Sequence, residues 1–204
     1  MNQSLIHRPF PIITGLFLLG ASLYFISHAA HFFSGEPGAL GKYLSFKWLI
    51  WPHIFFGAVS LLTGPFLLWE SFRNRWLKLH RGLGMAYVVA VAFSGTTAVI
   101  LSATTAYQVS RPYAFSLHVW VTAWLFATGF AFLMVKKRKL KFHKEWMVRS
   151  YLLTFAFVVS ALLLKIPLVQ RLGSFEEISP TLFWVGWVVP LFVYDVRLAM
   201  GNGK

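Results

Sequence analysis

The stretch Leu79–Tyr87, LHRGLGMAY, opens a long apolar segment with a histidine and decides how the rest of the chain is interpreted. The same arrangement recurs in three other apolar segments: His53 lies near the start of the preceding one, and His118 and His143 near the starts of the next two. Histidine is rare inside membrane segments, because burying its polar ring is costly. Four consecutive segments with one histidine each therefore predict a shared function for these side chains.

The composition predicts an integral membrane protein. Of the 204 residues, 57% are hydrophobic and 12% are charged, and the mean hydropathy is +0.64. Soluble domains contain about 25% charged residues. Apolar runs of about 20 residues, the length that crosses a hydrocarbon core, follow one another along the chain. We expect an all-α membrane protein that forms a single integral membrane domain over residues 1–204.

Six transmembrane helices are predicted, and the short loops between them make neighbours antiparallel. Their expected ranges are 9–33, 47–69, 80–105, 112–135, 146–166 and 180–200. Both termini are expected in the cytoplasm, because this orientation puts 14 of the 19 Lys and Arg residues on the cytoplasmic side. The others are Lys42, Lys47, Arg111, Lys165 and Arg171.

The formal charge of +13 is explained by basic loops that contact anionic membrane lipid, and not by binding of nucleic acid. The expected location is the bacterial inner (cytoplasmic) membrane, which the chain crosses several times. The chain has no cysteine, which excludes disulfides, thiolate metal sites and iron–sulfur clusters.

On this topology the four histidines form two pairs at matched depths. His53 and His118 begin helices that start at the outer face, whereas His80 and His143 begin helices that start at the cytoplasmic face. A helix of about 20 residues separates the two levels by roughly 20–30 Å. A central four-helix bundle, made of the second to fifth spans, can thus hold two haems with two axial histidines each. Such ligation leaves no open position on iron and suits electron transfer.

Other residues near these histidines are candidates for contacts with the cofactor. Gly57 and Gly84 each follow a histidine by four residues, on the same helix face, where a small residue leaves room for a porphyrin. Arg81 and Arg149 are candidates for binding the propionates of the inner haem. Asp195 in the last span is an alternative partner for Arg149.

Two further histidines leave several alternatives open. His28 and His31 share one helix face near the outer end of the first span. They are candidates for a substrate or quinone site beside the outer haem, for a transition-metal site with His53 and His118, or for solvated interfacial residues. A non-redox membrane scaffold, whose histidines cap helices and contact lipid headgroups, is a further alternative.

The placement of one histidine on each of the second to fifth spans resembles the cytochrome b561 fold. Three stretches are also similar to a family of uncharacterised bacterial membrane proteins: PHIFFG at 52–57, LHRGLGMAY at 79–87 and HKEWMVRSYLLTF at 143–155. The hallmarks of that family are H-R-x-x-G-x-x-Y and H-x-x-W-M-x-R-S-Y-x-L-T, and both occur here.

The resemblance implies that His53 and His118 ligate an outer haem b, and that His80 and His143 ligate an inner one. It also implies electron transfer across the membrane between a quinol or small reductant and an acceptor. The chain is then expected either to act as an oxidoreductase itself or to serve a redox partner protein. Quinol as the donor rests on analogy with other bacterial cytochromes.

Overall fold

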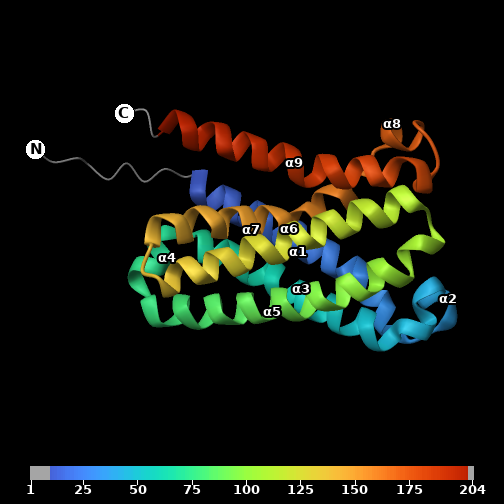
Figure 1. Ribbon diagram of the computed structural model, residues 1–204, viewed down its shortest axis with the longest axis horizontal. Helices are drawn as coiled ribbons and strands as arrows, with labels where there is room; N and C mark the ends of the chain where they lie inside the picture. Colours follow the sequence, from blue (N-terminus) through green and yellow to red (C-terminus); the bar gives the residue numbers. More distant parts are fainter. Residues whose placement is uncertain (1–9, 202–204) are drawn as a thin grey trace, which may run out of the picture.

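Six long helices make up the body of the protein (Figure 1). The computed structural model describes residues 10–201, and no strand occurs among them. The long helices are α1 (Phe10–Ala29), α3 (Lys47–Leu68), α5 (Leu77–Thr104), α6 (Arg111–Lys136), α7 (Leu140–Leu163) and α9 (Phe175–Gly201). All six are long and apolar enough to cross a membrane. The predicted all-α membrane fold with six spans is therefore confirmed; Pro9, where the first predicted span begins, lies outside the described residues.

Short helical segments, which sequence analysis did not predict, connect the long ones. They are η1 (Ala30–Ser34), α2 (Pro37–Leu40), η2 (Gly41–Phe46), α4 (Glu70–Arg75), η3 (Ala106–Gln108) and α8 (Pro167–Gln170). In addition, α5, α7 and α9 begin three, six and five residues before the predicted starts at 80, 146 and 180. Each of these extra stretches contains charged residues among apolar ones. Hydropathy does not mark them, because membrane helices continue beyond the hydrocarbon core into the headgroup region.

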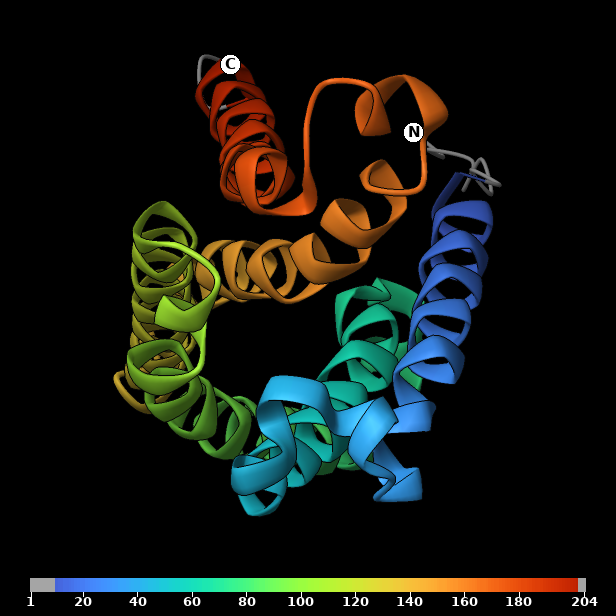
Figure 2. The same cartoon turned by 90° about the vertical axis from the view of Figure 1, so that its right-hand side faces the viewer.

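Four of the helices form a ring. Each contacts the next in the order α3, α5, α6, α7, and α7 contacts α3 again, as the view along the bundle shows (Figure 2). This ring is the central four-helix bundle predicted from the sequence. Outside it, α1 packs against α3 and α7, and α9 packs against α6 and α7. Within the ring α3 therefore lies diagonally across from α6, and α5 diagonally across from α7.

Glycines allow the close approach of neighbouring helices in this arrangement. A Cβ atom added to Gly64 of α3 would overlap the ring of Tyr151 on α7. A Cβ atom on Gly95 of α5 would overlap Leu125 of α6, and one on Gly186 of α9 would overlap Ser160 of α7. Small residues are enriched at membrane helix interfaces for this reason.

The two ends of the bundle differ in which helices begin there. Helices α3 and α6 begin at one end, named here the His53 end, and α5 and α7 begin at the opposite end, named here the His80 end (Figure 1). Helix α1 begins and α9 ends at the His80 end. The two ends of the described chain therefore lie on the same side of the membrane-spanning body.

A tight turn at the His80 end joins α6 to α7. Arg138 adopts a left-handed backbone conformation with φ of 58°, and no other non-glycine residue among the described ones has a positive φ. The amide of Lys139 donates to the carbonyl of Met134 at 2.9 Å, and the amide of Arg138 donates to the carbonyl of Val135 at 3.0 Å. These two bonds define a Schellman motif, in which glycine usually occupies the left-handed position.

Candidate functional site

All four predicted ligand histidines lie within the first eight residues of a ring helix. His53 of α3 and His118 of α6 lie at the His53 end, and His80 of α5 and His143 of α7 lie at the His80 end. Each pair thus joins two helices that are diagonal to each other in the ring. The four histidines thus lie two at each end of the ring, and their pairing as ligands stays a prediction.

His80 and His143 lie at the same end of the ring. His143, Arg73 and Arg81 all lie within electrostatic range of His80. The Nδ1 atom of His80 is buried and has no hydrogen-bond partner. A buried polar atom without a hydrogen-bond partner costs free energy. We therefore expect a ligand or a water molecule to bind this nitrogen.

The other pair is less closely joined. His53 lines a cavity of about 180 Å³, whereas the ring of His118 lies beside that of Tyr107, with 5.9 Å between the ring centres. The neighbouring residue Leu117 lines the cavity. His118 is therefore adjacent to the cavity but does not face His53 directly.

Hydrogen bonds fix which ring nitrogen is available for binding in three of these histidines. The Nδ1 atoms of His53, His118 and His143 lie 3.0, 2.7 and 2.9 Å from the carbonyl oxygens of Ser94, Ala114 and Ala131. A carbonyl oxygen only accepts, so Nδ1 carries the proton and Nε2 of the neutral ring keeps its lone pair. Metal-binding histidines usually donate their second ring N–H in this way.

These three bonds are not equally informative. His53 donates to α5, and His143 donates to α6, so that each ring is held across a helix interface. The bond of His118 stays within its own helical turn, and His28 makes the same local bond to the carbonyl of Tyr24 at 2.9 Å. The cross-helix bonds are therefore the ones that orient a side chain for ligand binding.

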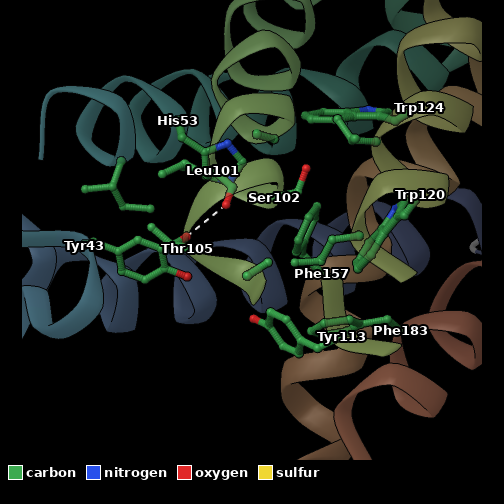
Figure 3. A pocket seen from close by; sticks show the side chains of 15 residues that line it. Tyr43, His53, Leu101, Ser102, Thr105, Tyr113, Trp120, Trp124, Phe157 and Phe183 are labelled. Atoms are coloured by element: carbon green, nitrogen blue, oxygen red, sulfur yellow. Dashed lines mark hydrogen bonds between the residues drawn. The ribbon is translucent and has the colours of Figure 1, made fainter. Parts of the chain in front are cut away.

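Aromatic side chains make up much of the cavity beside His53. His53 and Tyr43 lie on one side, and Trp120 and Trp124 lie on the other (Figure 3). The rings of Trp120 and Phe157 are stacked with 3.9 Å between their centres, and the Phe157 ring lies 6.3 Å from that of His53. The imidazole of His53 therefore faces a cavity lined largely by aromatic and apolar side chains.

The two sequence hallmarks meet in a buried hydrogen-bond network. The hydroxyl of Tyr87 lies 2.8 Å from both Ser150 Oγ and Thr154 Oγ1, and the Trp124 indole donates to Thr154 Oγ1 at 2.7 Å. Thr128 Oγ1 lies 2.6 Å from Ser150 Oγ. The network joins α5, α6 and α7 between the two histidine levels. Sequence analysis did not foresee it, although the hallmarks place Tyr87 seven residues after His80 and Ser150 seven after His143, on the same helix faces.

The two glycines predicted to leave room for a porphyrin lie where α3 and α5 pack together. A Cβ atom on Gly57 would lie 3.5 Å from Ser94 Oγ of α5, and one on Gly84 would lie 3.9 Å from Leu67 of α3. Helix packing alone explains both residues, and their contact with a cofactor stays a prediction.

Arg149 binds Asp195, the alternative partner proposed from the sequence. Its Nη2 atom donates to Asp195 Oδ1 of α9 at 2.6 Å, and its guanidinium lies over the rings of Trp146 and Tyr194. Nη1 is buried without a hydrogen-bond partner. The side chain thus joins α7 to α9 outside the ring, and propionate binding by Arg149 stays a prediction. Arg81 is exposed near His80.

His28 and His31 have different surroundings. His28 lines a second pocket, between α1 and α7. His31 does not line it: its ring packs against Phe32 with 4.1 Å between the ring centres. Among residues 10–201, no group of three or more His, Cys, Asp or Glu side chains is placed to hold a metal ion. Among these residues the structure therefore does not gather the alternative non-haem metal site of His28, His31, His53 and His118.

Residues 50–197 match the family model described as predicted membrane protein (DUF2306). The chain belongs to this family. The DUF2306 match covers α5, α6, α7 and all but the first three residues of α3. It includes the four candidate ligands and the Arg149–Asp195 pair, whereas α1 precedes it. No curated protein and no solved structure matches the chain.

Proposed function

We propose that this DUF2306 protein is a dihaem b-type cytochrome that transfers electrons across the membrane. His80 and His143 hold one haem b, and His53 and His118 hold the other. One observation carries the proposal: two histidines on the diagonal helices α5 and α7 lie at the same end of the ring, where the Nδ1 atom of His80 is buried without a partner. The arrangement of the second pair at the opposite end, on the remaining diagonal, supports a second site of the same kind.

The donor atoms fit axial ligation of haem. Neutral imidazole is a common axial ligand, and the bonds of His53 and His143 to backbone carbonyls leave Nε2 free and raise the basicity of the ring. The cavity beside His53, at about 180 Å³, is smaller than the roughly 300–1,000 Å³ of typical small-molecule sites. Haem binding at this end therefore requires aromatic side chains of the lining to move, and the ring of His118 to turn toward the cavity.

The chain's own residues have definite tasks in this proposal. The cross-helix bonds of His53 and His143 hold each imidazole in one orientation, and the stack of Trp120 on Phe157 places aromatic rings beside His53. Haem, when bound, would supply one-electron transfer at iron, and ligation by two imidazoles would favour electron transfer over oxygen chemistry. The network around Tyr87 keeps α5, α6 and α7, and with them the ligands, in register.

The proposed topology puts the His80 end in the cytoplasm, because the basic turns on either side of α4 and between α6 and α7 lie there. Both termini are then cytoplasmic, and the bacterial inner membrane is the proposed location. The placement of the four histidines on the ring helices resembles that in the cytochrome b561 fold, and this resemblance supports a bundle with two haems. The proposed donor is a quinol or another small reductant, and the acceptor is a second small molecule or a redox partner protein.

The test is a dithionite-reduced minus air-oxidised visible spectrum of the purified protein, with haem quantified per chain. A b-type α band with about two haems per chain is expected. Alanine variants of each ligand pair should lose one haem and keep the other, while the matched control His31→Ala should keep both. A chain that binds no haem when expressed with ample supply would overturn the proposal and favour a non-redox membrane scaffold.

A further inference from the structure

We propose that the pocket between α1 and α7 binds the ring of a quinol. The pocket has a volume of about 200 Å³ and lies at the His53 end, with His28, Tyr24 and Lys165 among apolar residues. An apolar cavity of about 150 Å³ is sufficient to hold benzene. The pocket therefore has room for one substituted six-membered ring, and a hydrocarbon tail can continue into the surrounding lipid.

The lining fits a flat ring with an apolar tail. Phe25 and Phe32 contribute aromatic faces from the α1 side, and Val158, Ala161 and Leu162 form the wall on α7. Aromatic pairs of this kind stabilise a ring beyond the burial of its area.

The polar groups of the pocket fit an uncharged head that both donates and accepts. His28 Nδ1 donates to the carbonyl of Tyr24 at 2.9 Å, which leaves Nε2 of the neutral ring as an acceptor for an O–H group. The Tyr24 hydroxyl accepts from Lys165 Nζ at 2.7 Å and keeps its own proton to donate. A quinol hydroxyl matches both groups.

An anionic lipid headgroup fits less well. Lys165 already donates to Tyr24, and its ammonium lies 4.6 Å from the centre of the Tyr24 ring. A phosphodiester has no proton to donate to His28 Nε2. Charge and hydrogen-bond complementarity therefore favour an uncharged ligand with O–H groups.

The pocket is separated from the proposed haem site at this end by α7 alone. Val158 lines the pocket, and the preceding residue Phe157 lines the cavity of His53, with its ring 6.3 Å from the imidazole. A helix with its side chains is about 10–12 Å across. As the site of the electron donor the pocket rests on the proposed function; as a binding site it does not.

The experiment measures binding of a decyl-substituted benzoquinol, under argon, to the full-length protein in phosphatidylcholine nanodiscs. His28→Leu should weaken binding of the quinol about tenfold, the value of one hydrogen bond, and should weaken binding of the oxidised quinone less, because the quinone has no O–H. The matched control His31→Leu, three residues away and outside the pocket, should bind like the wild type.

A second pair of variants tests the volume. Ala161→Trp fills the pocket and should abolish binding, whereas Ala92→Trp, at an exposed position of α5, should not. Equal affinities of the two histidine variants, or displacement of the quinol by phosphatidylglycerol, would overturn the inference. If the protein bound no haem but bound the quinol through His28, the quinol site would stand and the proposed electron-transfer function would fall. If the protein bound two haems but no quinol at this pocket, the proposed function would stand and the quinol site would fall.

Discussion

Tyr87 is fully buried in α5, and its hydroxyl contacts Ser150 and Thr154 of α7. We expect Tyr87→Phe to lower the free energy of unfolding by about 1 kcal/mol, the typical value of an interhelical hydrogen bond in a membrane protein. Unfolding in detergent, followed by tryptophan fluorescence, measures the change. The control Tyr107→Phe, at a half-exposed ring whose hydroxyl has no hydrogen bond in the structure, should leave stability unchanged. If both variants unfolded alike, the network would contribute nothing.

At the scale of single residues, the sequence was sufficient to identify the candidate histidines but not to predict the contacts of the residues around them. His53, His80, His118 and His143 stood out because polar rings are rare in apolar segments. The partners of Tyr87 could not be predicted, because serine and threonine in a membrane helix also bond to their own backbone, as Thr154 does to the carbonyl of Ser150. Which hydroxyl also bonds to another helix depends on how the helices are rotated.

Among the elements, the turn between α6 and α7 has a residue that does not suit its backbone. Arg138 is in the left-handed position where glycine is preferred. We expect Arg138→Gly to stabilise the protein by about 1 kcal/mol, because a left-handed conformation costs an L-residue about that much. The same unfolding assay measures it. Lys137→Gly is the control: Lys137 has φ of −80°, so added backbone freedom should lower stability. Destabilisation by both changes would contradict the expectation.

The helix boundaries were predicted well where they coincide with the ends of an apolar segment. They were predicted less well where charged residues extend the helix. The range predicted for α3, 47–69, differs from Lys47–Leu68 by one residue. The start of α7 was missed by six residues, because Leu140–Glu145 is rich in charge and extends the helix beyond the apolar segment. The pairing of α3 with α6 and of α5 with α7 across the ring follows from sequential antiparallel packing. The side-chain rotamer that turns His118 toward Tyr107 does not follow from it.

For the whole molecule, the orientation in the membrane is open to a direct test. The chain has no cysteine, so single cysteines report accessibility without background. Ser45→Cys, at the exposed end of η2, should react with an impermeant maleimide in intact cells; Ser71→Cys, on exposed α4 at the opposite end, should react only after lysis. The physical reason is the excess of Lys and Arg at the α4 end. The reverse labelling pattern would invert the topology and place His80 and His143 on the outside.

The bond between Arg149 and Asp195 also bears on how the protein is made. The two residues are 46 positions apart, so α7 enters the bilayer before α9, which carries the carboxylate. Insertion scales put the cost of an arginine at a helix centre at about 2.5–3.5 kcal/mol. When α7 first enters the membrane, the Arg149 guanidinium therefore has no counter-ion. Helix α9 later supplies the Asp195 carboxylate. A chain that stopped before α9 would leave this cation without its counter-ion, on the face of α7 that α9 otherwise covers.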